Sequence, residues 1–427
     1  MKKFLLLLIA VTIFVSSGYY FYQYQQKEAA KQQLIVEAKA KARKEAKILA
    51  PFTADIVDLA VFQPADLSDR FNFKALNEEM PNFDEVYLEI DSAEAVLYMS
   101  VPSLTTDVDE DYFQRTLFYV AANNFVLVPS LQQLVIFYSD QTFTIDRSAV
   151  IQEIQFEDLS VLQDSEKWKQ HVIKHLLDQD SMKRFVEATH AREGGLPSAS
   201  ELSRDEELLL YLYTNLGIQK SNLHELDFDF AKEMVMALEK IHGQYPDIKG
   251  YVTVIEYTDE IADDRWMEMT PTSSFNHGGI AINKSSFADL KSVADDWQIS
   301  LDYNFSPKGT SYRTMIVHEM AHALEAYLVY HQYSKYTDRE PAWDEGKIAR
   351  ELVNTAYDKV VPTLERKVSQ DRLLQQISEY AFDGGPSEAL AEAFHDVYDN
   401  GNNAHVYSLA IVDELNARLK EISEVRI

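Results

Sequence analysis

Residues 315–325 read MIVHEMAHALE, an apolar helical pattern interrupted by two histidines and a glutamate. His318 and His322 are four residues apart, so on an α-helix they lie about 40° apart on one face. Both imidazoles can therefore point at one ion. Apolar residues surround them, and a buried glutamate beside two histidines is costly unless it is paired. The stretch predicts a packed helix that carries a metal site.

The chemistry that such a helix supports is zinc-assisted hydrolysis. In the pattern H-E-x-x-H the histidines bind Zn²⁺, which lowers the pKa of a bound water and polarises a carbonyl group. Glu319 lies near the same face and is placed to act as general base. A second pair, His171 and His175, has the same spacing, but no glutamate follows its first histidine. We interpret that pair as a solvated helix face.

A catalytic zinc site needs a third protein ligand and leaves the fourth position open. The stretch ISEYAFDGGPSEALAEAFHDVY, residues 377–398, offers Glu388 and Glu392, one turn apart on a helix whose predicted N-cap is Ser387. Two carboxylates this close repel each other unless a cation lies beside them. One interpretation makes Glu388 the ligand and Glu392 a partner of a ligand histidine. The other makes both of them surface glutamates of an amphipathic helix.

The pairing of VHEMAHALE (317–325) with SEYAFDGGPSEALAEAF (378–394) resembles the anthrax toxin lethal-factor-type metallopeptidases, gluzincin-like enzymes that include the Pro-Pro endopeptidases. The resemblance covers roughly residues 275–400. It implies a set of roles at one zinc site: metal ligation by His318, His322 and Glu388, general base catalysis by Glu319, support of the ligands by Glu392, and hydrogen-bond donation to the oxyanion of the tetrahedral intermediate by Tyr380.

Two features depart from the family pattern. An extra helical segment over about 340–377 separates the two motifs, and DGG at 383–385 separates Tyr380 from the glutamate helix. We interpret the extra segment as a lid or packing element, or as one that shapes substrate access. His395, seven residues after Glu388, is interpreted as a surface histidine, and a group that supports the ligands of the site is the alternative.

Substrate contacts are expected along the strand GGIAIN, residues 278–283. As an edge strand it would pair with an extended peptide through main-chain hydrogen bonds, with Gly279, Ile280 and Ala281 as the substrate-binding residues. An ordinary interior strand is the alternative.

Composition excludes several classes of function. Lys and Arg total 40 against 69 Asp and Glu, a formal net charge of −29, which disfavours nucleic acid as a partner. The absence of cysteine excludes disulfides, thiolate metal sites and cysteine nucleophiles. Any metal must therefore be held by His, Asp or Glu.

The N-terminus has the pattern of an export segment. Lys2 and Lys3 precede an apolar run over 4–15 and an aromatic stretch that ends at Tyr24. We expect a signal or membrane anchor over 1–24 and a helical stalk over 25–50. The body would then be extracytoplasmic, tethered to the cell membrane, or secreted if the signal is cleaved; a cytoplasmic body is the alternative.

The rest of the chain predicts an α+β fold. We expect an α/β accessory domain over 51–165, a helix and linker over 166–198, and a mainly helical zincin-like catalytic domain with a small sheet over 199–427. The expected strands cover 85–90, 95–101, 133–138, 142–147, 250–257 and 278–282, and the expected helices 112–125, 203–216, 227–243 and 286–297.

Together these patterns predict an extracytoplasmic zinc endopeptidase that acts on a protein or peptide substrate. A non-catalytic cell-surface binding or scaffold protein that retains a zincin fold is the alternative. A third hypothesis makes residues 51–165 an interaction module. The cleavage motif and the oligomeric state stay open.

Overall fold

The computed structural model describes Leu49, Phe52 and residues 56–79, 85–102, 110–262 and 265–425. The predicted anchor over 1–24 lies outside the described residues, and so does the predicted stalk over 25–50 except for Leu49. No helix in the described ranges is long and apolar enough to cross a membrane. The fold is α+β, with a sheet in the N-terminal region and a mostly helical C-terminal region.

Five strands of the N-terminal region form one sheet in the order β1-β2-β3-β4-β5. Their bounds are Tyr87–Asp91 (β1), Val96–Val101 (β2), Gln133–Tyr138 (β3), Gln141–Asp146 (β4) and His190–Glu193 (β5). The four strands expected here are present, including the hairpin of β3 and β4. The helices are Ile56–Leu59 (α2), Arg70–Glu78 (α3), Glu110–Leu127 (α4), Arg147–Ile154 (α5), Ser165–Trp168 (α6), Lys174–Leu177 (α7) and Gln179–Ala188 (α8).

The contacts within the chain divide it into two compact units. The first comprises Met1–Asp84, Leu104–Leu134 and Thr144–His190, and the second comprises Glu85–Ser103, Val135–Phe143 and Ala191–Ile427. In the first unit α5, α7 and α8 pack against α4, which is apolar along most of its length because it is buried on all sides. The predicted metal site belongs to the second unit.

The C-terminal part of the second unit contains a four-stranded sheet in the order β6-β7-β9-β8. The strands are Lys220–Ser221 (β6), Val252–Thr258 (β7), Met267–Pro271 (β8) and Gly278–Asn283 (β9), and β8 is antiparallel to β9. The helices are Asp205–Leu216 (α9), Phe228–Gln244 (α10), Leu290–Asp302 (α11), Ile316–Gln332 (α12), Tyr336–Asp344 (α13), Lys347–Val360 (α14), Gln370–Ile377 (α15), Glu379–Asp383 (α16), Pro386–Asn400 (α17) and Val406–Val425 (α18).

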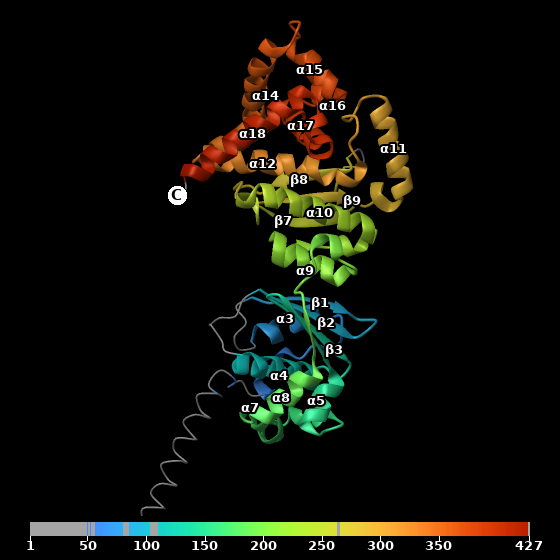
Figure 1. Ribbon diagram of the computed structural model, residues 1–427, viewed down its shortest axis with the longest axis vertical. Helices are drawn as coiled ribbons and strands as arrows, with labels where there is room; N and C mark the ends of the chain where they lie inside the picture. Colours follow the sequence, from blue (N-terminus) through green and yellow to red (C-terminus); the bar gives the residue numbers. More distant parts are fainter. Residues whose placement is uncertain are drawn as a thin grey trace, which may run out of the picture. The chain divides into compact units, whose positions relative to one another are not determined.

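Helix α12, which carries the opening motif, is the central element of this region. It packs against strand β8 on one side and helix α17 on another (Figure 1). Ile316, Val317, Met320, Ala321 and Leu324 are completely buried. The helix is apolar around much of its circumference because it is enclosed by other elements, as the sequence predicted.

The prediction of an edge strand at Gly279, Ile280 and Ala281 is wrong. These residues lie in β9, which pairs with β7 on one side and β8 on the other, so its backbone groups are already used. The edge of the described sheet next to α12 is β8, a strand that the sequence did not predict. A Cβ on Gly278 would come within 2.6 Å of Met269 Cε, so this glycine makes room for the side chain of the edge strand.

Candidate metal centre

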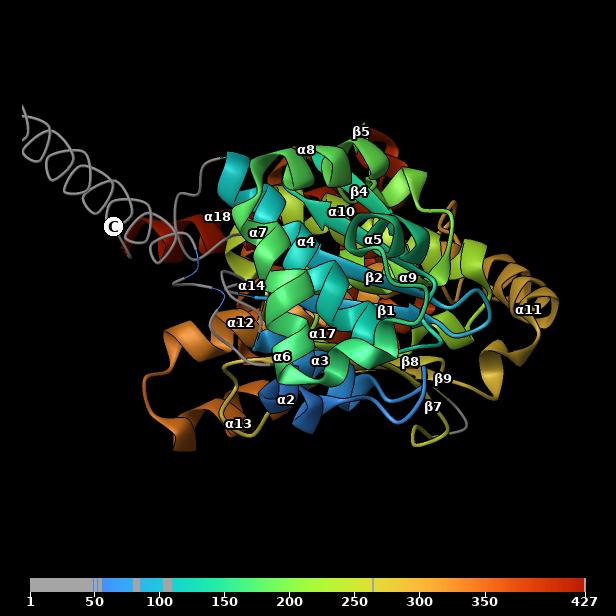
Figure 2. The same cartoon turned by 90° about the horizontal axis from the view of Figure 1, so that it is seen from below.

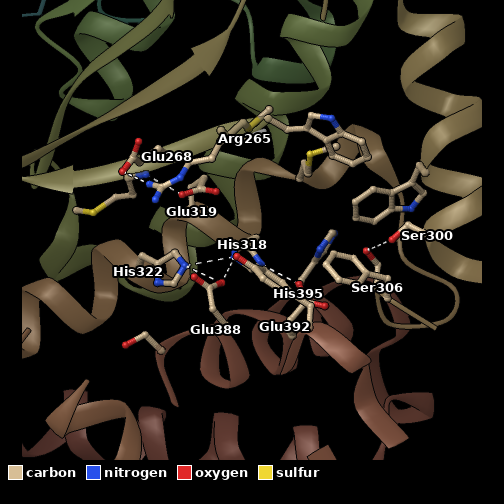
Figure 3. Close-up of a pocket in the computed structure, with 18 of the residues that line it drawn as sticks. Arg265, Glu268, Ser300, Ser306, His318, Glu319, His322, Glu388, Glu392 and His395 are labelled. Atoms are coloured by element: carbon tan, nitrogen blue, oxygen red, sulfur yellow. Dashed lines mark hydrogen bonds and ion pairs between the residues drawn. The ribbon is translucent and has the colours of Figure 1, made fainter. Parts of the chain in front are cut away.

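Three potential ligand atoms converge between α12 and α17 (Figure 3). His318 Nε2 lies 3.2 Å from His322 Nε2 and 2.9 Å from Glu388 Oε2, and His322 Nε2 lies 3.5 Å from Glu388 Oε2. The histidines come from successive turns of α12, and the glutamate comes from the first turn of α17. Among the described residues this is the one group of three or more side chains that could hold a metal ion.

The spacing of these atoms fits a zinc ion. Ligands about 2.0–2.1 Å from a tetrahedral Zn²⁺ are separated from each other by about 3.3 Å. The three separations of 2.9, 3.2 and 3.5 Å bracket that value. Two imidazoles and one carboxylate also form a ligand set that zinc enzymes use, with a fourth position left open.

The electrostatics of the site favour a cation. The side chains are largely buried, with exposures of 13% for His318, 11% for His322 and 23% for Glu388. Burial alone would lower the pKa of His318, but hydrogen bonds to Glu388 and Glu392 outweigh it and raise that pKa well above its usual value. Burial would raise the pKa of Glu388, but the histidines hold it far below its usual range. The carboxylates therefore stabilise positive charge here, and a metal ion would supply it in place of protons.

Glu392 orients the first histidine. Its Oε1 lies 2.9 Å from His318 Nδ1, and its Oε2 accepts a hydrogen bond of 2.9 Å from the Ser378 hydroxyl. The carboxylate is 3% exposed, so α17 holds it firmly behind the ligand. With Nδ1 engaged, Nε2 is the ring nitrogen that faces Glu388 and His322.

Glu319 leaves the helix on the side of strand β8. Its Oε2 accepts a hydrogen bond of 2.7 Å from the backbone N–H of Met269 (the carboxylate is drawn in Figure 3). Glu319 is 7% exposed and lines the same cavity as the three potential ligands. It is not a member of the group of potential ligands among the described residues.

Tyr380 lies over the first histidine. Its ring is stacked against His318 at a centroid distance of 6.1 Å and against Phe305 at 5.2 Å. Burial, followed by the negative charge of Glu388, raises the pKa of its hydroxyl, which stays a proton donor at neutral pH. The two glycines after α16 thus do not remove Tyr380 from the site.

The group opens onto a cavity of about 990 Å³. Residues 265–271, which include all of β8, form one wall. Helices α11 and α13, which lie on opposite sides of this region in Figure 2, also contribute residues to the lining. Three apolar side chains at the rim are unusually exposed: Ile299 (54%), Tyr303 (78%) and Phe305 (50%). Gly279, Ile280 and Ala281 are absent from the lining. Trp343 and Asp344 of the extra segment contribute to it.

His395 does not lie at the surface, where the sequence analysis placed it. It is completely buried and lines the cavity, and its Nε2 lies 3.0 Å from the Thr314 hydroxyl, which donates a 2.7 Å hydrogen bond to Asp399. Its ring packs on Trp297 at 5.8 Å. The surface interpretation failed because α17 is covered on this side as well, which its own periodicity did not reveal. The cluster fixes the start of α12 to α17.

The second histidine pair has a different environment. His175 Nδ1 lies 2.8 Å from the Ser181 hydroxyl and 3.3 Å from a carboxylate oxygen of Glu153, while the ring of His171 packs on Phe156. Neither belongs to a potential metal-binding group in the part of the chain that the structure describes. The pair is more enclosed than a fully solvated face, and its contacts are those of local packing.

Comparison of the chain with models of known families, with curated proteins and with solved structures finds no match. The structure by itself shows a partly buried group of side chains that could hold a metal ion beside an open cavity: His318, His322 and Glu388.

Proposed function

We propose that this protein is a zinc-dependent endopeptidase related to the lethal-factor-type metallopeptidases. The observation that carries the proposal is the triangle of His318 Nε2, His322 Nε2 and Glu388 Oε2, whose sides match the spacing of ligands around tetrahedral zinc. Glu319 and Tyr380, which the family assigns to catalysis, line the same cavity.

The residues of the site divide the work of hydrolysis among them. Bound zinc would supply Lewis acidity, polarising the scissile carbonyl and acidifying a water molecule. Glu319 takes a proton from the water molecule while the water oxygen adds to the carbonyl carbon. Glu319 then passes the proton to the leaving amine as the C–N bond breaks. Tyr380 donates a hydrogen bond to the oxyanion that forms in between.

The substrate would lie along β8. Along an antiparallel strand the backbone N–H and C=O groups of successive residues point alternately to its two sides. The N–H of Met269 points toward Glu319 and not toward β9, so the backbone groups of Met267 and Met269 lie on the free side of β8. An extended peptide can pair with the free carbonyl groups there. This arrangement would bring its backbone alongside Glu319, where the general base is needed.

The test is zinc content combined with peptide hydrolysis. We expect about one zinc per chain, hydrolysis of a mixed peptide library that a chelator abolishes, and loss of hydrolysis in Glu319→Gln with zinc retained. Glu345→Gln, which changes an exposed carboxylate outside the cavity lining, serves as the matched control and should stay active. Undiminished hydrolysis by Glu319→Gln would rule out the mechanism.

For location, we propose an extracytoplasmic body tethered by the N-terminal segment. The support is the order of Lys2, Lys3 and the apolar run over 4–15, together with the absence of cysteine. Protease added to intact cells should digest the body of a tethered protein. Protection until the cells are lysed would place the body inside.

A further inference from the structure

Glu325, three residues after the second histidine, is a completely buried carboxylate. Its Oε1 accepts hydrogen bonds from the backbone N–H of Ala349 at 3.3 Å and from the hydroxyl of Ser387 at 3.2 Å. Its Oε2 has no hydrogen-bond partner within the described part of the chain. One side chain of the histidine helix α12 thus contacts both α14 and α17.

Both contacts fall at helix N-termini that lack a side-chain cap. Helix α14 begins after Gly346 and helix α17 after Gly385, and neither glycine can supply a capping oxygen. Ala349 is the third residue of α14, where a free N–H requires an acceptor. Ser387, the predicted N-cap of α17, is instead its second residue, and its hydroxyl is directed to Glu325. Glu325, which belongs to α12, therefore caps the N-terminus of α14.

The approach of the two helix ends is close. A Cβ on Gly346 would lie 2.8 Å from the Ser387 hydroxyl oxygen, and this glycine has a φ of 56°. The glycine lets the extra segment touch α17 next to Glu388, which directly follows Ser387. The segment between the two motifs thus abuts the residue that precedes the carboxylate ligand.

Among the residues that the structure describes, no lysine or arginine balances the charge of Glu325. Burial raises the pKa of this carboxyl group, and the strongest opposing influence is the positive charge of His322. A buried carboxylate with an unpaired oxygen costs free energy. Positive charge at the neighbouring metal site would offset that cost.

We propose that Glu325 is a positioning residue of the metal centre: it clamps the N-terminal ends of α14 and α17 to the histidine helix, and its charge strengthens metal binding at His318, His322 and Glu388. The inference rests on the proposed metal site. It also assigns a role to the extra segment, because α14 is one of the two helices that Glu325 holds in place and so helps to position Glu388.

The decisive variant is Glu325→Gln, which keeps an oxygen for Ser387 and Ala349 but removes the charge. We expect its zinc affinity to fall about 10-fold, as is usual for groups that support a ligand. The melting temperature of the zinc-free protein should stay the same or rise, because an unbalanced buried charge is lost. A residue that only supported the fold would lower the melting temperature and leave the affinity unchanged.

A second variant tests the contact to α17. Ser387→Ala removes the hydroxyl and should weaken zinc binding several-fold. The double variant with Glu325→Gln should lose less affinity than the two single losses combined, because both act through one contact. Glu345→Gln, an exposed carboxylate of the same segment, is the control and should bind zinc like the parent.

Affinity is measured on the full-length protein by competition with a chromogenic zinc chelator, and stability by thermal unfolding after metal removal. Unchanged affinity in Glu325→Gln, additive losses in the double variant, or a melting temperature that falls without a loss of affinity would each overturn the inference. If the parent protein itself binds no zinc, the proposed function fails and not this inference alone.

Discussion

Glu319 and Met269 are joined by a hydrogen bond of 2.7 Å from the backbone of the edge strand to the carboxylate that follows the first histidine. The bond connects α12 to β8 through two residues that lie 50 positions apart in the sequence. One carboxylate oxygen is held by the strand, so the orientation of the base depends on the position of the strand along which we place the substrate.

Removing that bond should slow catalysis. Met269→Pro deletes the N–H, and an edge strand tolerates proline on its free side. Hydrogen bonds to charged groups contribute about 1.5–3 kcal/mol, so we expect kcat to fall roughly 10- to 100-fold. Zinc content should not change. Met269→Leu, which keeps the N–H, is the control in steady-state assays; an equal loss in both variants would contradict a role for the bond.

Metal removal should lower thermal stability. A ligand that binds only the folded state at 100 times its Kd adds about 2.7 kcal/mol, which corresponds to a rise in Tm of roughly 5–10 °C. We therefore expect zinc to raise the Tm of chelator-treated protein by that amount. His322→Ala should abolish the rise, whereas His171→Ala should retain it. A similar rise in both variants would mean that zinc binds elsewhere.

Acid should destabilise the protein through His242. This residue of α10 is 6% exposed, and neither ring nitrogen has a hydrogen-bond partner among the described residues. Burial lowers its pKa from 6.5 to about 4. Above pH 6.5 the ring is neutral in both states. As pH falls toward 4, only the unfolded state takes up the proton, so the folded state loses about 3 kcal/mol relative to it.

The check is denaturant unfolding of zinc-free protein between pH 7 and pH 5. Replacement of the ring in His242→Leu should remove part of the acid sensitivity, so that the variant gains on the parent as pH falls. The exposed His190→Gln serves as control. A constant difference between His242→Leu and the parent across this range would show that the buried ring does not contribute.

The local sequence was sufficient to predict helix α12 at the centre of the site. The i, i+4 spacing of His318 and His322 and the apolar residues around them specify a buried helix with two imidazoles on one face, because helical periodicity alone sets those directions. The same holds for most strands of the N-terminal sheet, whose β-branched and aromatic runs end at turn residues.

Strand β8 illustrates what local pattern misses. Its residues, MEMTP, include Met and Glu, which favour helices, and it is a strand because it pairs with β9. That pairing makes β8 the edge strand and β9 an interior strand. The cavity wall beside Glu319 is therefore formed by residues 265–271 and not by the predicted residues 279–281. Edge or interior position is a property of the whole sheet.

By itself, the sequence determined which side chains are able to bind a metal and the helix on which two of them lie. Only the tertiary structure decided that Glu388 meets those histidines, that Glu392 stands behind His318, and that His395 and Glu325 are buried. The physical reason is distance along the chain: Glu388 Oε2 and His318 Nε2 lie 2.9 Å apart across 70 residues. Such a contact is set by how helices pack, which no local periodicity encodes.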